Sequence, residues 1–175
     1  MRLVPESSLT FEQLRTMLAA APPRIAALTD GLAPALLHTP PAPNEWSAND
    51  VLAHLRACAD VWGRSMMTML AQDRPTIRAI SPRTWIRTTD YPEQEFGPSL
   101  HAFATQRAEL LAVLELLAPE VWSRAATMTG AGKPLEQTVL SYAQGLALHE
   151  RPHVKQIERI VQTMQMAKGD AHEES

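Results

Sequence analysis

Cysteine, aromatic residues and excess positive charge are scarce in this chain, and each scarcity excludes a class of protein. Cys58 is the only cysteine among 175 residues, so no internal disulfide can form, which fits a reducing compartment. Phe, Trp and Tyr account for only 5% of the residues, too few for a surface that stacks nucleic-acid bases. A formal net charge of -3 argues against a nucleic-acid binder, which normally carries a basic stripe.

Long apolar runs are also missing. No apolar stretch approaches the roughly 18 residues that cross a membrane, and residues 1–6 lack the apolar core of a signal peptide. A chain of 175 residues is long enough to bury the core of one domain without disulfide staples. We therefore expect a soluble, cytoplasmic protein of one domain, without a membrane or nucleic-acid partner.

Helical periodicity, in contrast, is abundant. Apolar residues recur at spacings of three and four, whereas no stretch alternates convincingly as a strand would. Thr10 and Gln13 have the spacing of a capping box that opens a first helix. Pro22 and Pro23 follow, and because proline has no backbone N–H to donate, we expect them to interrupt this helix.

A second helix has the sharpest predicted start. Ser47 is the expected N-cap, and Asp50, three residues later, is its capping partner. Trp46 and Val51 can pack against each other across the cap as a hydrophobic staple. An inward apolar stripe follows, and the helix should end near Pro75.

The rest of the chain is predicted to form a long connection and two further helices. Residues 74–98 show no periodicity, and a connection of this length is usually a functional loop or a crossover. Gly97-Pro98-Ser99 introduces the third helix. The turn cluster over residues 129–134 leads into the fourth, which we expect to stop at Lys168-Gly169.

Together these patterns predict an all-α fold, a four-helix bundle with a long crossover connection. One domain should cover residues 1–169, and residues 170–175 should form a flexible C-terminal tail. The pattern also allows a homodimer.

Three histidines fall on the inward faces of two of these helices. His149 and His153 are four residues apart, which places them one turn apart on one face of the fourth helix. His54 lies at the edge of the inward stripe of the second helix. Three neutral imidazoles that converge from two packed helices make a divalent-metal site with open coordination positions. The competing interpretation is that each ring is only a buried, hydrogen-bonded histidine, as single core histidines usually are.

Two neighbours of the histidines allow more than one interpretation. Glu150 also points inward, and it either accepts a hydrogen bond from a ligand histidine, neutralises Arg107, or forms an ion pair without function. Cys58 lies one turn after His54 and could add a sulfur ligand, although a small buried hydrophobe is the favoured interpretation. Residues 149–153 also match the H-E-x-x-H string of zinc peptidases. The Arg and Pro inside the string and the lack of a strand pattern argue against a peptidase.

In these residues the chain resembles the DinB-like, or YfiT-like, superfamily. The first matching element is Trp46-Ser47-x-x-Asp50-Val51-Leu52-x-His54-Leu55, and the second is His149-Glu150-x-x-His153-x-x-Gln156-Ile157. Their order and separation agree with the family, over a stretch from about Leu9 to Met166.

The resemblance implies both a topology and a cofactor. It implies a bundle in up-down-down-up order with a long second crossover, and a nickel or zinc ion held by His54, His149 and His153. Some members of the family transfer a low-molecular-weight thiol such as bacillithiol or mycothiol onto electrophiles.

The predicted site suits two kinds of chemistry on a small-molecule substrate. A three-histidine ion can lower the pKa of bound water or of a thiol, which favours hydrolysis or thiol transfer. In the connection over residues 74–98 we expect Arg83 and Arg87 to bind the anionic groups of the substrate, although a solvated basic loop is the competing interpretation. We therefore predict a metal-dependent enzyme of thiol S-transferase or hydrolase type. The alternative is a non-catalytic metal-binding or stress-related interaction protein.

Overall fold

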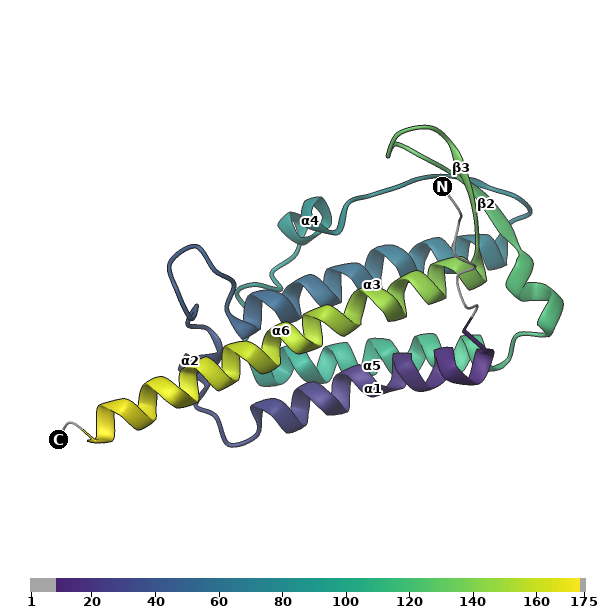
Figure 1. Cartoon of the computed structure of the whole chain (residues 1–175). Coiled ribbons are helices and arrows are strands. Elements are labelled where there is room, and N and C mark those ends of the chain that lie inside the picture. The colour runs from purple at the N-terminus through teal and green to yellow at the C-terminus, as the bar shows by residue number, and fades with distance from the viewer. Residues whose placement is uncertain (1–8, 174–175) are drawn as a thin grey trace, which may run out of the picture.

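Four long helices lie side by side in the part of the chain that the structure describes. In this computed structural model the backbone is described over residues 9–173 and the side chains over residues 9–167. The long helices are α1 (Phe11–Thr29), α3 (Ala48–Ala71), α5 (Phe96–Glu115) and α6 (Val139–Glu173). Figure 1 shows them packed along a common direction, which confirms the predicted four-helix bundle.

The helices follow an up-down-down-up order. In Figure 1, α1 and α6 run in one direction along the bundle, and α3 and α5 run in the other, as the family resemblance implies. Both α1 and α3 pack against α5 and α6. Because α3 and α5 are consecutive and parallel, the chain returns along the bundle between them. The shorter helical elements are α2 (Pro34–Leu37), α4 (Pro82–Trp85), η1 (Ile86–Thr88) and η2 (Pro119–Ser123).

Both predicted capping boxes are present. Thr10 and Gln13 exchange side-chain and backbone hydrogen bonds at the start of α1. At the start of α3, the Ser47 backbone N–H donates to the Asp50 carboxylate at 2.8 Å, and the Asp50 N–H donates to the Ser47 hydroxyl at 3.1 Å. These bonds satisfy backbone N–H groups that a helix leaves without partners in its first turn. The start of α3 is thereby fixed by an N-cap seven residues before His54.

The prediction that Pro22 and Pro23 interrupt the first helix is wrong, because α1 continues through both. Pro22 cannot donate to the carbonyl oxygen of Leu18, one turn earlier. Arg107 on α5 supplies a donor instead, with its Nη1 atom 3.2 Å from that oxygen. Since this donor comes from a different helix, no local pattern around the prolines could reveal it.

A small sheet is present that the helical pattern did not predict. The strands β1 (Thr76–Arg78), β2 (Ala125–Thr129) and β3 (Leu135–Thr138) lie in the order β1-β2-β3. β1 is parallel to β2, and β3 is antiparallel to it. The predicted turn cluster joins β2 to β3, with positive φ angles at Gly130 and Gly132 that glycine adopts without steric cost. Strands this short show no clear alternation, and β1 pairs with residues remote in the sequence.

α6 runs past its predicted end. A stop was expected at Lys168-Gly169 and a flexible tail over residues 170–175, but the helix continues to Glu173. A single glycine destabilises a helix by only about 1 kcal/mol relative to alanine, so it does not end a helix by itself. Residues 174–175 of the predicted tail and residues 1–8 of the predicted domain lie outside the described residues.

The apolar core forms two clusters along the bundle. One cluster lies toward the sheet and includes Met66 and Leu114, and the other includes Leu52 and Phe103. Residues from all four long helices contribute to the core. Within the described residues, none of the helices has a stretch long and apolar enough to span a lipid bilayer.

Candidate metal centre

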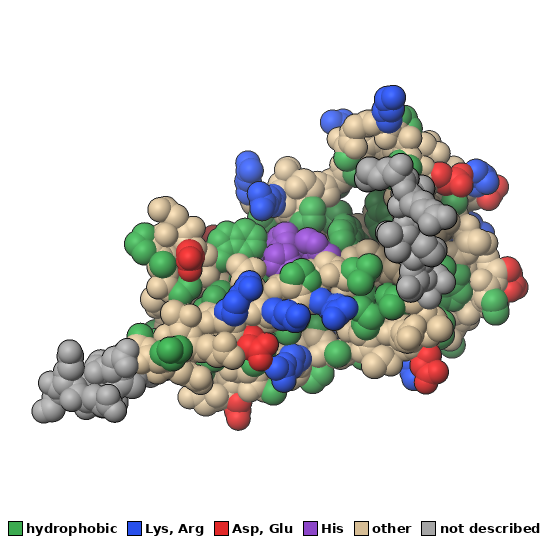
Figure 2. All heavy atoms as spheres, viewed as in Figure 1, with side chains coloured by type: hydrophobic (Ala, Val, Ile, Leu, Met, Phe, Trp, Pro, Cys, Tyr) green, Lys and Arg blue, Asp and Glu red, His purple; other side chains and the backbone are tan. Residues whose placement is uncertain are grey.

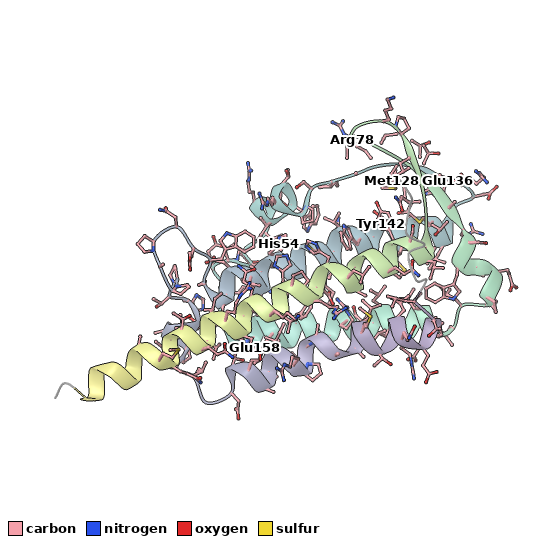
Figure 3. The ribbon with its side chains drawn as sticks, viewed as in Figure 1. His54, Arg78, Met128, Glu136, Tyr142 and Glu158 are labelled. Atoms are coloured by element: carbon pink, nitrogen blue, oxygen red, sulfur yellow. The ribbon has the colours of Figure 1, made fainter. Side chains whose placement is uncertain are left out.

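Three imidazoles meet between α3 and α6. His54 comes from α3, and His149 and His153 come from α6, as predicted. One nitrogen from each ring lies within 4.8 Å of the other two. The ring centres of His54 and His153 are 4.8 Å apart, although the two residues are remote in the sequence. Figure 3 places His54 where α3 and α6 lie side by side.

Two tryptophans pack against this cluster. Trp46 stacks on His153 with the ring planes 14° apart, and its ring centre is 5.3 Å from that of His54. The ring centre of Trp62 is 5.2 Å from that of His149. Large, flat side chains in these positions restrict the imidazole rings and keep water from part of their surface. The cap pattern identified Trp46 as a staple residue but could not show its contact with a histidine of α6.

The surroundings favour the neutral form of the imidazoles. Burial, followed by the nearby His153, His149 and Arg83 side chains, lowers the pKa of His54 to about 4. Burial and His153 also lower the pKa of His149. Both rings are therefore neutral near pH 7, and each retains a nitrogen lone pair that can bind a metal ion.

The spacing of one pair of ring nitrogens fits a metal ion, and the third nitrogen lies within 4.8 Å of both. The Nε2 atoms of His54 and His149 are 3.1 Å apart. Two nitrogens bonded to one ion at about 2.1 Å lie roughly 3.0 to 3.4 Å apart in octahedral or tetrahedral geometry. No carboxylate belongs to the described group, so imidazole nitrogen is its donor type. Such a donor set suits both zinc and nickel.

Gln156 orients one of the three rings. Its Oε1 atom lies 3.1 Å from Nδ1 of His153, three residues earlier on α6. When the amide oxygen accepts the Nδ1–H, the free lone pair of His153 is on Nε2. Gln156 is part of the second matching element, but the pattern assigned it no role. An amide one turn after a candidate ligand is the signal that could have revealed this contact.

Cys58 lies beside the cluster. Its Sγ atom is 3.5 Å from Nε2 of His54, and the side chain is fully buried. Burial and the nearby carboxylate of Glu150 raise the pKa of the thiol to about 12. The thiol is therefore neutral near pH 7, as expected for a cysteine that fills a small space in the core.

Glu150 points into the bundle as predicted, where it pairs with Arg107. Both carboxylate oxygens accept from this guanidinium, one of them from Nη1 at 2.9 Å. Burial raises the pKa of the Glu150 carboxyl, and the ion pair with Arg107 opposes that shift. Two of the roles considered for Glu150 can be compared with these contacts. Its carboxylate neutralises Arg107 and does not accept a hydrogen bond from an imidazole of the cluster. A carboxylate held in this way is also unsuited to be the general base of a zinc peptidase.

An open cavity of about 650 Å³ reaches the cluster. His153 and Trp46 form part of its lining. Charged side chains also line it: Arg83 from α4, Arg159 from α6, and Glu45 from the loop before α3. Figure 2 shows the histidines in a hollow of the surface, with one basic patch to their upper left and a row of Lys and Arg side chains below them, along α6.

The two arginines predicted to bind substrate have different positions. Arg83 lines the cavity, whereas Arg87 is exposed on η1 and is not among the lining residues. Arg159 lines the cavity but was not predicted. Arg151, Lys155 and Arg159 recur every four residues on the exposed side of the helix that carries two histidines. This row of positive charges is the sequence signal that could have identified Arg159.

Comparison with known proteins assigns the family. The model of the DinB superfamily matches residues 17–157, which is most of the chain. The chain belongs to the DinB superfamily. Both matching elements of the predicted resemblance, with all three histidines, lie inside this range.

The fold of this DinB protein is similar to that of YfiT from Bacillus subtilis. The TM-score is 0.77 at 18% sequence identity, and the alignment covers 94% of each chain. YfiT is described as a probable metal-dependent hydrolase with an unusual four-helix bundle topology. At this identity the likeness establishes a shared fold. No curated protein matches the chain.

Proposed function

We propose that His54, His149 and His153 bind one divalent metal ion, nickel or zinc, and that the protein is a metal-dependent enzyme acting on a small anionic molecule. The observation that carries this proposal is the convergence of three imidazoles at the edge of an open cavity. An ion that only held two helices together would need no opening beside it, whereas a catalytic ion needs a free position for water or substrate. The description of YfiT as a probable metal-dependent hydrolase supports the same class of chemistry.

The charges around the cavity support an anionic substrate. Arg83 and Arg159 line the cavity, and Arg151 and Lys155 continue the positive row on the exposed side of α6. Positive groups around an opening raise the local concentration of anions and the rate at which they arrive. A guanidinium can also hold a carboxylate through two parallel hydrogen bonds.

The ion and the residues around the cluster would have separate roles in the reaction. When bound, the ion would act as a Lewis acid that lowers the pKa of a water molecule or a thiol. Gln156 holds the His153 ring, Trp46 limits the access of water, and Arg83 and Arg159 hold the anionic end of the substrate. Thiol transfer from a cofactor such as bacillithiol or mycothiol is our first candidate, and two arginines suit in particular the carboxylates of a thiol such as bacillithiol. Hydrolysis is the second, supported by the likeness to YfiT.

Metal content tests the assigned ligands. In protein purified without an affinity tag and assayed by mass spectrometry, His153→Ala should lose most of the bound metal, because one of three imidazoles is missing. His101→Ala is the matched control, since His101 is exposed on α5 and lies outside the cluster. Equal metal content in the two variants would reject the site.

The reaction is tested on the metal-loaded protein, with a chelated sample as the control. Bacillithiol, mycothiol and glutathione are offered together with electrophiles such as epoxides, and simple esters and amides are offered for hydrolysis. Thiol consumption above the chelated control supports transfer, and ester or amide cleavage supports hydrolysis. If neither exceeds that control, thiol transfer and hydrolysis of these substrates are rejected, and the alternative of a non-catalytic metal protein is favoured.

A further inference from the structure

Asp60 is the centre of a hydrogen-bond network that ties the crossover between α3 and α5 to α3. The Nε1–H of Trp85 and the hydroxyl of Tyr91 both donate to its Oδ2 atom, at 2.9 and 2.7 Å. The side-chain amide of Gln106 on α5 donates to the other oxygen, Oδ1. None of these partners is an imidazole of the cluster or a residue of the cavity lining.

Two arginines of α3 hold the same aromatic rings from their faces. The guanidinium carbon of Arg64 lies 4.2 Å from the centre of the Trp85 ring, and that of Arg56 lies 3.8 Å from the centre of the Tyr91 ring. Each ring is thus bound through its polar group by Asp60 and on its face by a cation. Arg56, Asp60 and Arg64 recur every four residues, so they form one stripe along α3.

The segment that this stripe holds contributes one residue, Arg83, to the lining of the cavity. Trp85 is the last residue of α4, and Arg83, two residues earlier, lines the cavity together with His153. Both α4 and η1 pack against α3. None of the ion pairs among the described residues involves Arg83, so the place of this side chain depends on the place of α4.

We propose that Asp60 is a positioning residue: by holding Trp85 and Tyr91 it fixes α4 on α3 and keeps Arg83 at the histidine cavity, where Arg83 binds the anionic group of the substrate. The role of Arg83 rests on the proposed function, whereas the anchoring of the crossover does not. Asp60 contacts neither the imidazoles nor the cavity, so its effect on the substrate passes through α4.

Two substitutions separate the hydrogen bonds of Asp60 from its charge. Asp60→Asn removes the charge but keeps an oxygen for Trp85 and Tyr91, and the Gln106 amide can rotate to accept from the new N–H. Asp60→Ala removes the charge and all three acceptor contacts. If Asp60 acted through its charge alone, both variants would bind an anion at Arg83 more tightly, because a nearby negative charge is lost. If Asp60 instead acts by holding α4 in place, only Asp60→Ala should bind the anion more weakly.

Hydrogen–deuterium exchange of the full-length protein, with and without Ni²⁺, tests the anchoring. Asp60→Ala should speed exchange in residues 79–95 by about tenfold and leave the long helices unchanged. Asp60→Asn should resemble the wild type. Asp73→Ala, which removes a charge from an exposed position just after α3, should do so as well. Unchanged exchange in Asp60→Ala, or an increase spread evenly over the molecule, overturns the proposal.

Binding of glutathione to the Ni²⁺-loaded protein, followed through thiolate-to-nickel absorption, tests the effect on the cavity. Asp60→Ala should raise the dissociation constant of glutathione by about tenfold with Ni²⁺ affinity unchanged, and Asp60→Asn should stay within about twofold. Tighter glutathione binding in both variants overturns the proposal in favour of a charge effect. If the wild type binds no Ni²⁺ or no glutathione, the proposed function fails at that step, and exchange in residues 79–95 still decides whether Asp60 anchors the crossover.

Discussion

The ion pair of Arg107 and Glu150 places two full charges inside the bundle. The two side chains are only 2% and 3% exposed. Replacing Glu150 by glutamine leaves the guanidinium of Arg107 buried without its counter-charge. We expect Glu150→Gln to lower the free energy of unfolding by about 3–5 kcal/mol, as measured by urea denaturation at neutral pH.

Glu158 provides a matched control on the same helix. It pairs with Arg24 at the surface, where the two side chains are 31% and 56% exposed. Because water screens such a pair, Glu158→Gln should lower the free energy of unfolding by less than about 1 kcal/mol. Equal losses in Glu150→Gln and Glu158→Gln would show that burial does not set the cost of breaking the inner pair.

At the scale of the element, α1 carries two adjacent prolines with different surroundings. Pro22 is buried, and the Leu18 carbonyl that it cannot serve accepts a hydrogen bond from Arg107. Pro23 is exposed, and it leaves the carbonyl of Ala19 without a helical donor. We expect Pro23→Ala to raise the free energy of unfolding by about 1 kcal/mol, since the restored helical hydrogen bond outweighs the greater freedom of the unfolded chain. Thermal unfolding measures this change.

Pro22→Ala is the comparison within the same helix. Its gain should be smaller, because the Leu18 carbonyl already has a donor and the proline ring fills part of the core. A larger gain from Pro22→Ala than from Pro23→Ala would contradict the compensation by Arg107.

The elements that could be predicted from the sequence depend on interactions within one or two helical turns. The two capping boxes and the pair His149 and His153 are of this kind, so their spacing alone identified them. The continuous α1 and the small sheet depend on partners remote in the sequence, such as Arg107 for the first and β2 for β1. The site, too, could be predicted from the sequence only where local spacing determines it. Inward periodicity identified the three histidines, but the contact of Trp46 with His153 follows from how the helices pack.

Asp60 is a residue that the sequence marks as unusual without identifying its partners. It lies in a run of otherwise mostly small and apolar residues in the middle of α3, which is a local sign that its carboxylate has partners. The identity of those partners follows from the path of the crossover, which no spacing within α3 encodes. A charge within an apolar run therefore indicates that hydrogen-bond partners exist, and only the fold shows which residues they are.

At the scale of the whole molecule, stability should depend on pH through the histidine cluster. Burial and the neighbouring His153, His149 and Arg83 side chains lower the pKa of His54 from 6.5 to about 4 in the folded protein. Between these values the unfolded chain binds more protons than the folded chain, so the free energy of unfolding rises with pH in this window. In metal-free protein we expect a loss of roughly 3 kcal/mol as the pH falls from the upper to the lower value.

Urea unfolding at several pH values, with and without metal, measures this dependence. His54→Gln cannot gain the proton and should lose less stability on acidification than the wild type, whereas His101→Ala, at an exposed position, should behave as the wild type. Added Ni²⁺ or Zn²⁺ should stabilise the protein near neutral pH and lose its effect as the pH falls toward the lowered pKa of His54, about 4, because protons and metal compete for the same nitrogens. Metal stabilisation that persisted unchanged into acid would indicate carboxylate ligands, and the three imidazoles would then not be the site.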